Sequence, residues 1–215
     1  MAFAFPEGAS FQFSTTFASA KTISDISNAS PAVATATAHG YADGDLVLIA
    51  SGWDDVNDSV VKVNQLAADT FELLGVNTSE TGRYPVGTGG GTAKKISGWQ
   101  VIPQVLTIAS QGGDSRYTQV QLLSRRNAIQ IPTGFNSSSI QLSLAYDPGN
   151  AVFEEMLDVS RGSTQCAFRM VLSGGVTTVG YGYMAVSEMP QLNSNQVATI
   201  AVTMTLGGRP ISYSA

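Results

Sequence analysis

The stretch SSIQLSLAYDPGNAVFEEMLDVSRGSTQCAFRMVL, residues 138–172, decides the fold of this chain. Apolar side chains stand at every second position from Ile140 to Tyr146, with Gln141, Ser143 and Ala145 between them. A period of two residues is typical of a strand with one buried side and one solvent-facing side. The turn sequence Asp147-Pro148-Gly149 ends this strand, because proline cannot donate to the hydrogen-bond ladder of a sheet.

The next segment takes the period of an amphipathic helix. On a helical wheel, the apolar residues of 152–159 lie on one arc and the acidic residues lie on the opposite arc. The spacing predicts a helix over 152–161, with Asp147 or Asn150 as its N-terminal cap and Gly162 as its C′ residue. Alternation resumes from Cys166 to Leu172, which predicts a second half-buried strand with Cys166 on its apolar side.

The remainder of the chain outside residues 21–95 predicts an N-terminal arm at 1–10, more strands, a long polar loop at Ser124–Phe135 and a short tail at 207–215. One short helix among many strands indicates a mainly β fold, which we expect to be a β-sandwich or half-barrel with the helix packed on it. The strands are predicted at Phe11–Phe17, Val105–Ala109, Tyr117–Leu123, Val176–Ser187 and Ala198–Leu206.

Composition excludes several classes of protein. Charged residues make up 13% of the chain, well below the usual quarter, and the net charge is −5. The sequence has no basic patch, so sequence-specific nucleic-acid binding is not expected. The single cysteine, Cys166, excludes an internal disulfide and fits a reducing compartment. We expect no signal peptide and no membrane span, because aliphatic stretches such as Leu46–Ala50 are short.

Residues 21–95 differ in composition from the rest of the chain. They carry nine acidic and five basic side chains, so four of the five net negative charges belong to them. We interpret them as a small acidic β module inserted into a main domain formed by residues 1–20 and 96–215. The flexible glycine run Gly87–Gly91 stands near its end. Its short strands are predicted at Val33–Thr37, Leu46–Ala50, Ser59–Leu66 and Thr70–Leu74.

No pattern of catalytic or metal-binding residues is complete. His39 is the sole histidine and is interpreted as a polar loop residue, and the chain has no Gly-x-Ser-x-Gly elbow. The acidic segment 54–59 lacks the glycine and glutamate of a calcium loop, so a solvated turn is expected, with a weak surface cation site as the alternative. Trp53 and Trp99 are interpreted as packing residues. We therefore predict a protein that is not an enzyme and has no cofactor and no metal.

The main domain resembles the major tail tube protein of long, non-contractile-tailed bacteriophages. The resemblance rests on an ordered set of pieces: an N-terminal strand, a strand near 101–109, a long loop, the helix 152–161 and three antiparallel strands. The sequence markers within this set are Leu144-Ala145-Tyr146-Asp147-Pro148-Gly149, Phe168-Arg169-Met170-Val171 and Gly180-Tyr181-Gly182-Tyr183.

The inserted module resembles a small β module of phage structural proteins, which is itself similar to the first catalytic cysteine half-domain of ubiquitin-activating enzymes. The similarity rests on residues 26–31, 37–41, 44–47 and 70–73. The module has no cysteine, so the resemblance implies no ubiquitin chemistry.

The tail tube resemblance implies a homo-oligomer: six copies form a ring, and rings stack into a hollow tube. Each subunit would give strands to a continuous inner β-barrel around a channel for phage DNA, which removes exposed sheet edges. The implied partners are a tape measure protein, tail-end proteins and DNA held non-specifically in transit, without membrane insertion. The implied location is the virion, after assembly in the bacterial host cytoplasm, with the inserted module on the tube exterior.

Two sets of residues are candidates for roles in such a tube. Arms and loops supply contacts between subunits and rings, and the candidates there are Phe3, Phe5, Arg125, Arg126, Pro132, Phe135, Arg209 and Tyr213. A channel wall must not hold DNA, and non-specific binding comes from lysine and arginine. The candidate lumen-facing residues, none of them basic, are Gln119, Gln121, Gln141, Ser143, Thr199, Thr203 and Thr205.

Two alternatives remain open at this point. A single-ring tail terminator or baseplate hub of the same fold would form rings that never elongate. A surface carbohydrate-binding β module is suggested by residues 21–95 and by Trp53. Electron microscopy of the purified protein separates the first alternative from a tube, and glycan binding by the fragment 21–95 would favour the second.

Overall fold

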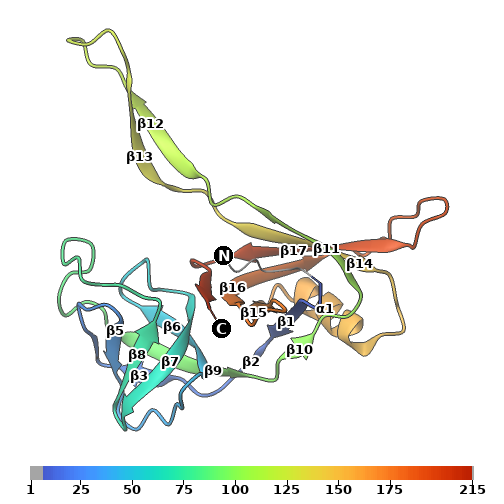
Figure 1. The fold of residues 1–215 in the computed structure, drawn as a ribbon, viewed down its shortest axis with the longest axis horizontal. Helices are drawn as coiled ribbons and strands as arrows, with labels where there is room; N and C mark the ends of the chain where they lie inside the picture. Colours follow the sequence, from blue (N-terminus) through green and yellow to red (C-terminus); the bar gives the residue numbers. More distant parts are fainter. Residues whose placement is uncertain (1–6, 215) are drawn as a thin grey trace.

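The computed structural model describes residues 7–214, and the N-terminal residues that include Phe3 and Phe5 lie outside this range. Two eight-stranded sheets, a two-stranded arm and one helix make up the described chain (Figure 1). Both large sheets are antiparallel throughout, and neither closes into a barrel. The mainly β fold with one short helix is therefore confirmed.

The first sheet, called the main sheet, curves around the larger hydrophobic core. β14 lies between β11 and β17. Its Leu142 and Leu144 are buried and the residues next to them are not, as the alternating sequence predicts for a half-buried strand. The order across the sheet is β10 (Gln100–Val101), β1 (Ser10–Ser14), β15 (Gln165–Val171), β16 (Thr177–Val186), β17 (Thr199–Leu206), β14 (Ser139–Ala145) and β11 (Val105–Gln111), with β18 (Ile211–Tyr213) also beside β16.

The helix α1 (Ala151–Arg161) covers one face of the main sheet and confirms the sequence prediction. Phe153, Met156 and Val159 are its buried residues, and they pack into the core with Leu142 and Val202. Asn150 is the N-terminal cap: its Oδ1 accepts a hydrogen bond from the amide of Val152 at 3.0 Å.

The end of α1 differs from the prediction. Gly162 has an ordinary helical φ of −74°, and its amide donates to the carbonyl oxygens of Asp158 and Ser160. Ser163 has the left-handed φ of 48° that was expected at Gly162. The turn therefore comes one residue later than the glycine indicates.

The second sheet, built largely from residues 21–97, contains all four strands predicted in the acidic segment. It encloses its own core, which includes Ile49, Val61, Phe71 and Leu73. The order across the sheet is β2 (Thr16–Phe17), β9 (Gly91–Ser97), β6 (Leu46–Ser51), β7 (Ser59–Ala67), β8 (Thr70–Leu74), β5 (Ala32–Thr35) and β4 (Asp25–Ile26), with β3 (Lys21–Ile23) beside β9. The predicted single strand Phe11–Phe17 is wrong, because β1 and β2 divide it between the two sheets.

The glycine run at 87–91 is not a free linker. A Cβ on Gly89 would lie 2.9 Å from the Trp53 ring, and a Cβ on Gly91 would lie 1.9 Å from the carbonyl oxygen of Ala50. These glycines let the chain approach its neighbours closely, and Gly91 begins β9. The prediction of a flexible run is therefore wrong at its end, because packing against Trp53 and β6 fixes the backbone.

The second sheet packs against the face of the main sheet that lies opposite α1. Leu46, Leu48 and Ile96 form a buried cluster with Val179 and Tyr181, and Ala167 of β15 is also in this cluster with no exposed surface. The predicted strand from Cys166 is therefore buried on both sides here rather than half-buried. Its small Ala167 allows the second sheet to pack closely.

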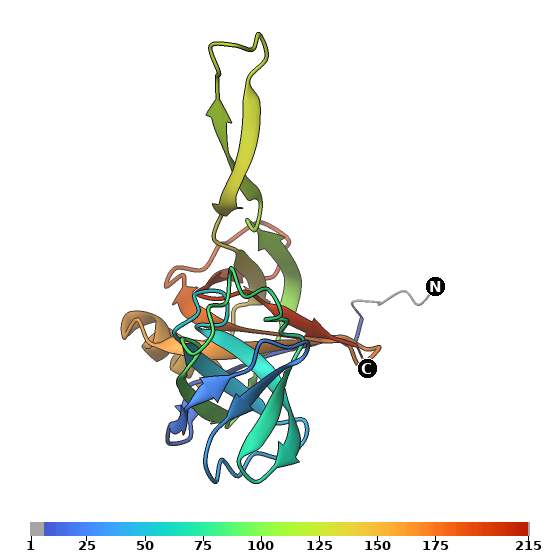
Figure 2. The same ribbon diagram turned by 90° about the vertical axis from the view of Figure 1, so that its left-hand side faces the viewer.

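The arm is a two-stranded ribbon that extends far from both sheets (Figure 2). It consists of β12 (Ser115–Val120) and β13 (Ile129–Phe135), so the loop predicted at Ser124–Phe135 is wrong over most of its length. Consecutive glycines Gly112 and Gly113, with φ of 81° and 78°, lie between β11 and β12. The arm therefore continues the β11–β14 hairpin past a sharp bend.

Candidate assembly interface

One half of the main sheet has an exposed face without charged residues. In the register of β14 and β17, Gln141 pairs with Thr203, Ser139 pairs with Thr205 and Ala145 pairs with Thr199. Because directly opposed residues project from the same side of a sheet, five of the predicted lumen-facing residues share this face: Gln141, Ser143, Thr199, Thr203 and Thr205.

The same face continues onto the neighbouring strands. Thr107, Ala109 and Gln111 of β11 oppose Ser143, Gln141 and Ser139. Tyr183 and Ala185 of β16 oppose Thr205 and Thr203, and both are exposed. No lysine, arginine, aspartate or glutamate stands at these positions of the four strands. We call this surface, formed by β11, β14, β17 and the end of β16, the neutral face.

Gln119 and Gln121 do not belong to the neutral face. Gln119 lies on β12, opposite Gln130, and Gln121 follows that strand near the tip of the arm. The side-chain amide of Gln121 donates to the carbonyl oxygen of Arg125 at 2.7 Å, which helps to hold the tip. Gln119 and Gln121 were predicted to face the lumen with Gln141 because all three are polar. The bend at Gly112 places them on the arm instead, away from Gln141.

The strand β11 is an open edge of the main sheet. It pairs with β14 on one side, and none of the other described strands lies on its outer side. Six of its seven residues are exposed, among them Leu106 at 54% and Ile108 at 40%. A long edge strand with exposed aliphatic side chains is a template for pairing with another chain.

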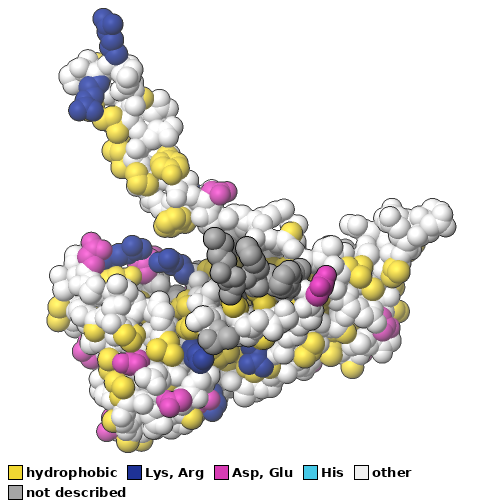
Figure 3. All heavy atoms as spheres, viewed as in Figure 1, with side chains coloured by type: hydrophobic (Ala, Val, Ile, Leu, Met, Phe, Trp, Pro, Cys, Tyr) yellow, Lys and Arg dark blue, Asp and Glu magenta, His cyan; other side chains and the backbone are white. Residues whose placement is uncertain are grey.

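The arm exposes apolar and basic side chains together. Tyr117 is 59% exposed, Ile131 is 48% exposed and Phe135 is 65% exposed. Figure 3 shows hydrophobic side chains along the arm and basic side chains at its tip, where Arg125 and Arg126 are located. An isolated two-stranded ribbon is marginally stable in water, and exposed apolar side chains of this kind are typical of surfaces that contact another molecule. Pro132 is tolerated in β13 because both arm strands are edges.

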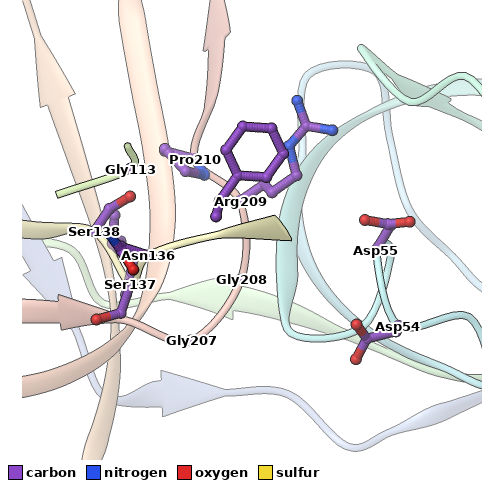
Figure 4. Close-up of a pocket in the computed structure, with 12 residues that line it drawn as sticks. Asp54, Asp55, Gly113, Asn136, Ser137, Ser138, Gly207, Gly208, Arg209 and Pro210 are labelled. Carbon is purple, nitrogen blue, oxygen red and sulfur yellow. The ribbon is translucent and has the colours of Figure 1, made fainter. Parts of the chain in front are cut away.

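The other predicted contact residues have varied surroundings. Arg209 lines a recess of about 520 Å³ between the second sheet, the base of the arm and the end of β17, with Asp54 and Asp55 on the opposite wall (Figure 4). Phe135 also lines this recess.

Tyr213 acts within the subunit. Its hydroxyl accepts a hydrogen bond from the amide of Lys62 at 2.8 Å and donates to the carbonyl oxygen of Leu74 at 3.0 Å. The predicted tail is thus partly the strand β18, which joins the main sheet to the second sheet, and the Tyr213 hydroxyl is engaged within the subunit rather than available to another one.

His39 lies in the loop between β5 and β6, as predicted, and its side chain is buried. Its Nδ1 accepts from the amide of Tyr41 at 2.9 Å, and its Nε2 lies 3.0 Å from the carbonyl oxygen of Ala67. A carbonyl can only accept, so the ring is the neutral tautomer with the proton on Nε2. Both nitrogens are engaged in holding the second sheet, and the ring also packs against Phe71.

Cys166 is buried in the main core, and this burial raises the pKa of its thiol to about 12. A thiol with such a raised pKa is inert rather than nucleophilic.

The acidic segment 54–59 takes part in an ion pair. The Arg83 guanidinium hydrogen-bonds to the Asp55 carboxylate and lowers the pKa of that carboxyl. Within residues 7–214, three or more His, Cys, Asp or Glu side chains do not gather anywhere in a way that could hold a metal ion.

Trp53 is 3% exposed, as expected of a packing residue. Its indole Nε1 donates to the hydroxyl of Thr88 at 2.8 Å, and its ring meets Tyr84 edge to face. Sugar-binding sites use exposed aromatic faces, so the feature that suggested a carbohydrate-binding module is absent at Trp53. The guanidinium carbon of Arg169 lies over the ring of Trp99, 4.6 Å from the centroid of that ring.

Sequence reasoning missed the loop between β16 and β17. Met189 and Leu192 are each 77% exposed, and Val197 is 66% exposed. The available signal was three large apolar residues in a segment of proline, asparagine, serine and glutamine that separates two clear strands. We call residues 187–198 the apolar loop.

No helix within residues 7–214 has the length and apolar character needed to cross a membrane.

Comparison with known proteins gives one sequence family. The family model described as "Phage tail tube protein, TTP" matches residues 51–215. No curated protein matches the chain in sequence. Among solved structures, the SPP1 tail tube is 14% identical with a TM-score of 0.44, and the match covers 55% of this chain and 70% of that one. The tube-terminating cap of the anti-feeding prophage is 15% identical with a TM-score of 0.36, over 54% of this chain and 83% of that one.

Proposed function

Because the chain belongs to the phage tail tube protein family, we propose that six copies close into a ring and that the rings stack into a tube that conducts DNA. Membership of this family makes the protein a structural component of the virion that assembles into a tube. The ring size, the identity of the channel wall and the passage of DNA are parts of the proposal.

The observation that carries the proposal is the neutral face next to the open edge of β11. The main sheet is unfinished within the subunit, because β11 has a pairing partner on only one side among the described strands. Pairing of β11 with a strand of a neighbouring copy would satisfy these backbone groups. Repetition of this pairing around a ring closes a barrel and removes the exposed edges.

The neutral face suits the inner wall of such a barrel. Lysine and arginine bind DNA by neutralising its phosphates, and a wall that carries them would slow its passage. The strand positions of the neutral face are uncharged, and the exposed ones include Gln141 and Thr205. We propose that Gln141, Ser143, Thr199, Thr203 and Thr205 line the channel, and that Gln119 and Gln121 do not.

The second sheet occupies the outside of the tube in this arrangement. It covers the main sheet next to the neutral face but leaves that face free, and it carries most of the acidic side chains. We further propose that the channel holds a tape measure protein before DNA, that tail-end proteins close the tube, and that assembly takes place in the host cytoplasm. The single free cysteine in the described chain fits that reducing compartment.

Negative-stain electron microscopy of the purified protein tests this function. We expect hollow tubes of stacked rings at high protein concentration. Single rings that never elongate would indicate a terminator or hub instead. A species that stays monomeric, both in purified form and in virions, would overturn the proposal.

A further inference from the structure

Two exposed apolar surfaces lie at opposite ends of the strands that form the neutral face. The arm leaves the main sheet where β11 ends and β14 begins, and the apolar loop joins β16 to β17 at the other end (Figure 1). If the neutral face lines the channel, these two ends belong to the two opposite surfaces of a ring. This inference therefore rests on the proposed function.

The apolar loop keeps a defined shape while it exposes its side chains. The hydroxyl of Ser187 donates to the carbonyl oxygen of Met189 at 3.1 Å, and Gln191 forms an isolated β-bridge with Thr199. At its base, the Nε of Arg161 lies 2.8 Å from Glu188 Oε1 and connects the loop to the end of α1. A loop held in this way presents Leu192 without the full entropy cost of ordering it on binding.

The charges of the two ends are complementary. Residues 115–135, which form the arm, contain Arg116, Arg125 and Arg126 and no acidic residue. The opposite end carries Glu188 at the start of the apolar loop and the acidic face of α1, including Glu154 and Asp158, and Arg161 is its single basic residue. Opposite potentials on two surfaces favour their encounter and disfavour the pairing of like ends.

We propose that the arm of one copy docks onto the apolar loop of a copy in the next ring. Leu123 at the arm tip is fully exposed, and it would pack against Met189 and Leu192 while the tip arginines face the acidic end of α1. The contact joins two different surfaces and does not close on itself. Such a contact repeats without limit along an axis, as stacking of rings into a tube requires.

Cysteine cross-linking in assembled tubes tests this contact. The variant carries Leu123→Cys and Leu192→Cys, two exposed positions whose replacement leaves the core intact. Cys166 is buried and its thiol is inert, so it does not compete for oxidation. The matched control pairs Leu192→Cys with Val86→Cys, because Val86 is 76% exposed in the loop between β8 and β9. Tubes of both variants are oxidised and separated on a non-reducing gel.

The proposal expects a ladder for the first pair that extends beyond the number of subunits in one ring, and no ladder for the control pair. Tubes that give no ladder, or a ladder that stops at the ring size, would overturn the inter-ring contact and leave the tube function standing. A protein that forms neither rings nor tubes would overturn the proposed function itself, and the contact with it.

A charge-reversal variant provides a second readout. Arg125→Glu with Arg126→Glu should give rings that fail to stack, because both ends would then be acidic. Adding Glu188→Lys should restore some stacking. Normal tubes from the first variant would contradict the electrostatic part of the contact.

Discussion

Gly180 and Gly182 show how single residues set the spacing of the main sheet. A Cβ on Gly182 would lie 1.9 Å from the carbonyl oxygen of Thr205, and one on Gly180 would lie 2.5 Å from the Phe168 ring. The intervening Tyr181 and Tyr183 project from the other side, toward the second sheet and the neutral face. The sequence Gly-Tyr-Gly-Tyr thus gives one close-packed side and one aromatic side.

Gly182→Ala should destabilise the subunit by about 2 to 3 kcal/mol, because β16 and β17 must move apart to admit the methyl group. Chemical denaturation followed by tryptophan fluorescence measures the change. Gly174→Ala is the control, since a Cβ there meets nothing within 4 Å. Equal stability of the two variants would contradict the close approach.

Tyr213→Phe should lower the free energy of unfolding by about 1 to 3 kcal/mol, because the amide of Lys62 loses its hydrogen-bond acceptor in a half-buried site. Thermal unfolding measures this loss, and Tyr117→Phe on the exposed arm is the control. A variant as stable as the parent protein would show that Tyr213 does not join the two sheets energetically.

Alkaline pH should weaken the fold through three buried groups. Burial raises the pKa of Cys166 from 9.0 to about 12, and that of Tyr41 and Tyr213 from 10.0 to about 12. Between these values the unfolded chain releases protons that the folded chain retains, so the free energy of unfolding falls as pH rises from about 9 to 12. Urea denaturation over this pH range measures the slope, and Tyr213→Phe should flatten it above pH 10. A slope that Tyr213→Phe leaves unchanged would contradict the burial of that hydroxyl.

At the scale of elements, local chemistry predicted α1 and the strands of the main core well. The alternation of 140–146 and the apolar arc of 152–159 depend only on neighbours within one element. The first strand of the arm, β12, was predicted at Tyr117–Leu123, but β13 escaped prediction because it is exposed on both sides and its sequence has no alternation to detect. The packing of the second sheet onto Ala167 could not be predicted either. An alanine on the less apolar side of a strand is compatible both with exposure to solvent and with burial under a second sheet.

The candidate site was predicted in part for the same physical reason. Gln141 and Thr203 stand on strands with clear alternation, so their shared face could be derived. Gln119 could not be placed, because the bend at Gly112 and Gly113 is set by two left-handed residues rather than by a hydrophobic pattern. The exposed Leu192 was missed because a loop gives no period from which exposure can be inferred.

Removal of the arm should abolish stacking without unfolding the subunit. None of the residues of β12 and β13 is fully buried, so their deletion exposes little core. In a variant with residues 115–135 replaced by two glycines, the melting temperature should stay within a few degrees of the parent protein. Sedimentation and electron microscopy should then find rings or smaller species in place of tubes. Tubes of normal length would show that the arm makes no essential contact.

At the scale of the whole molecule, charge is segregated between surfaces. The second sheet holds most of the negative charge, the arm holds three arginines and the neutral face holds no charge. This distribution suits a wall segment with an outer side, an inner side and two different ends. Each side of the subunit then has a distinct role in a repeating assembly.

Basic residues introduced on the neutral face should make the channel wall bind DNA. Tubes of a variant with Gln141→Arg and Thr203→Arg should retain short DNA duplexes, with a retention that falls steeply as salt rises. Co-pelleting of labelled duplexes with tubes measures this effect. Val86→Arg, in the exposed loop between β8 and β9, is the control. Equal retention by the two variants would argue against a lumen-facing position for Gln141 and Thr203.

In the proposed assembly, neighbouring copies complete the main sheet, and its neutral face encloses a channel. A cryo-electron microscopy map of the assembled protein would show whether this is so. We expect a hollow tube whose inner wall is built from β11, β14, β16 and β17, with Gln141 and Thr203 facing the channel. A tube lined by the strands of the second sheet, or a β11 edge left unpaired in the assembly, would contradict it.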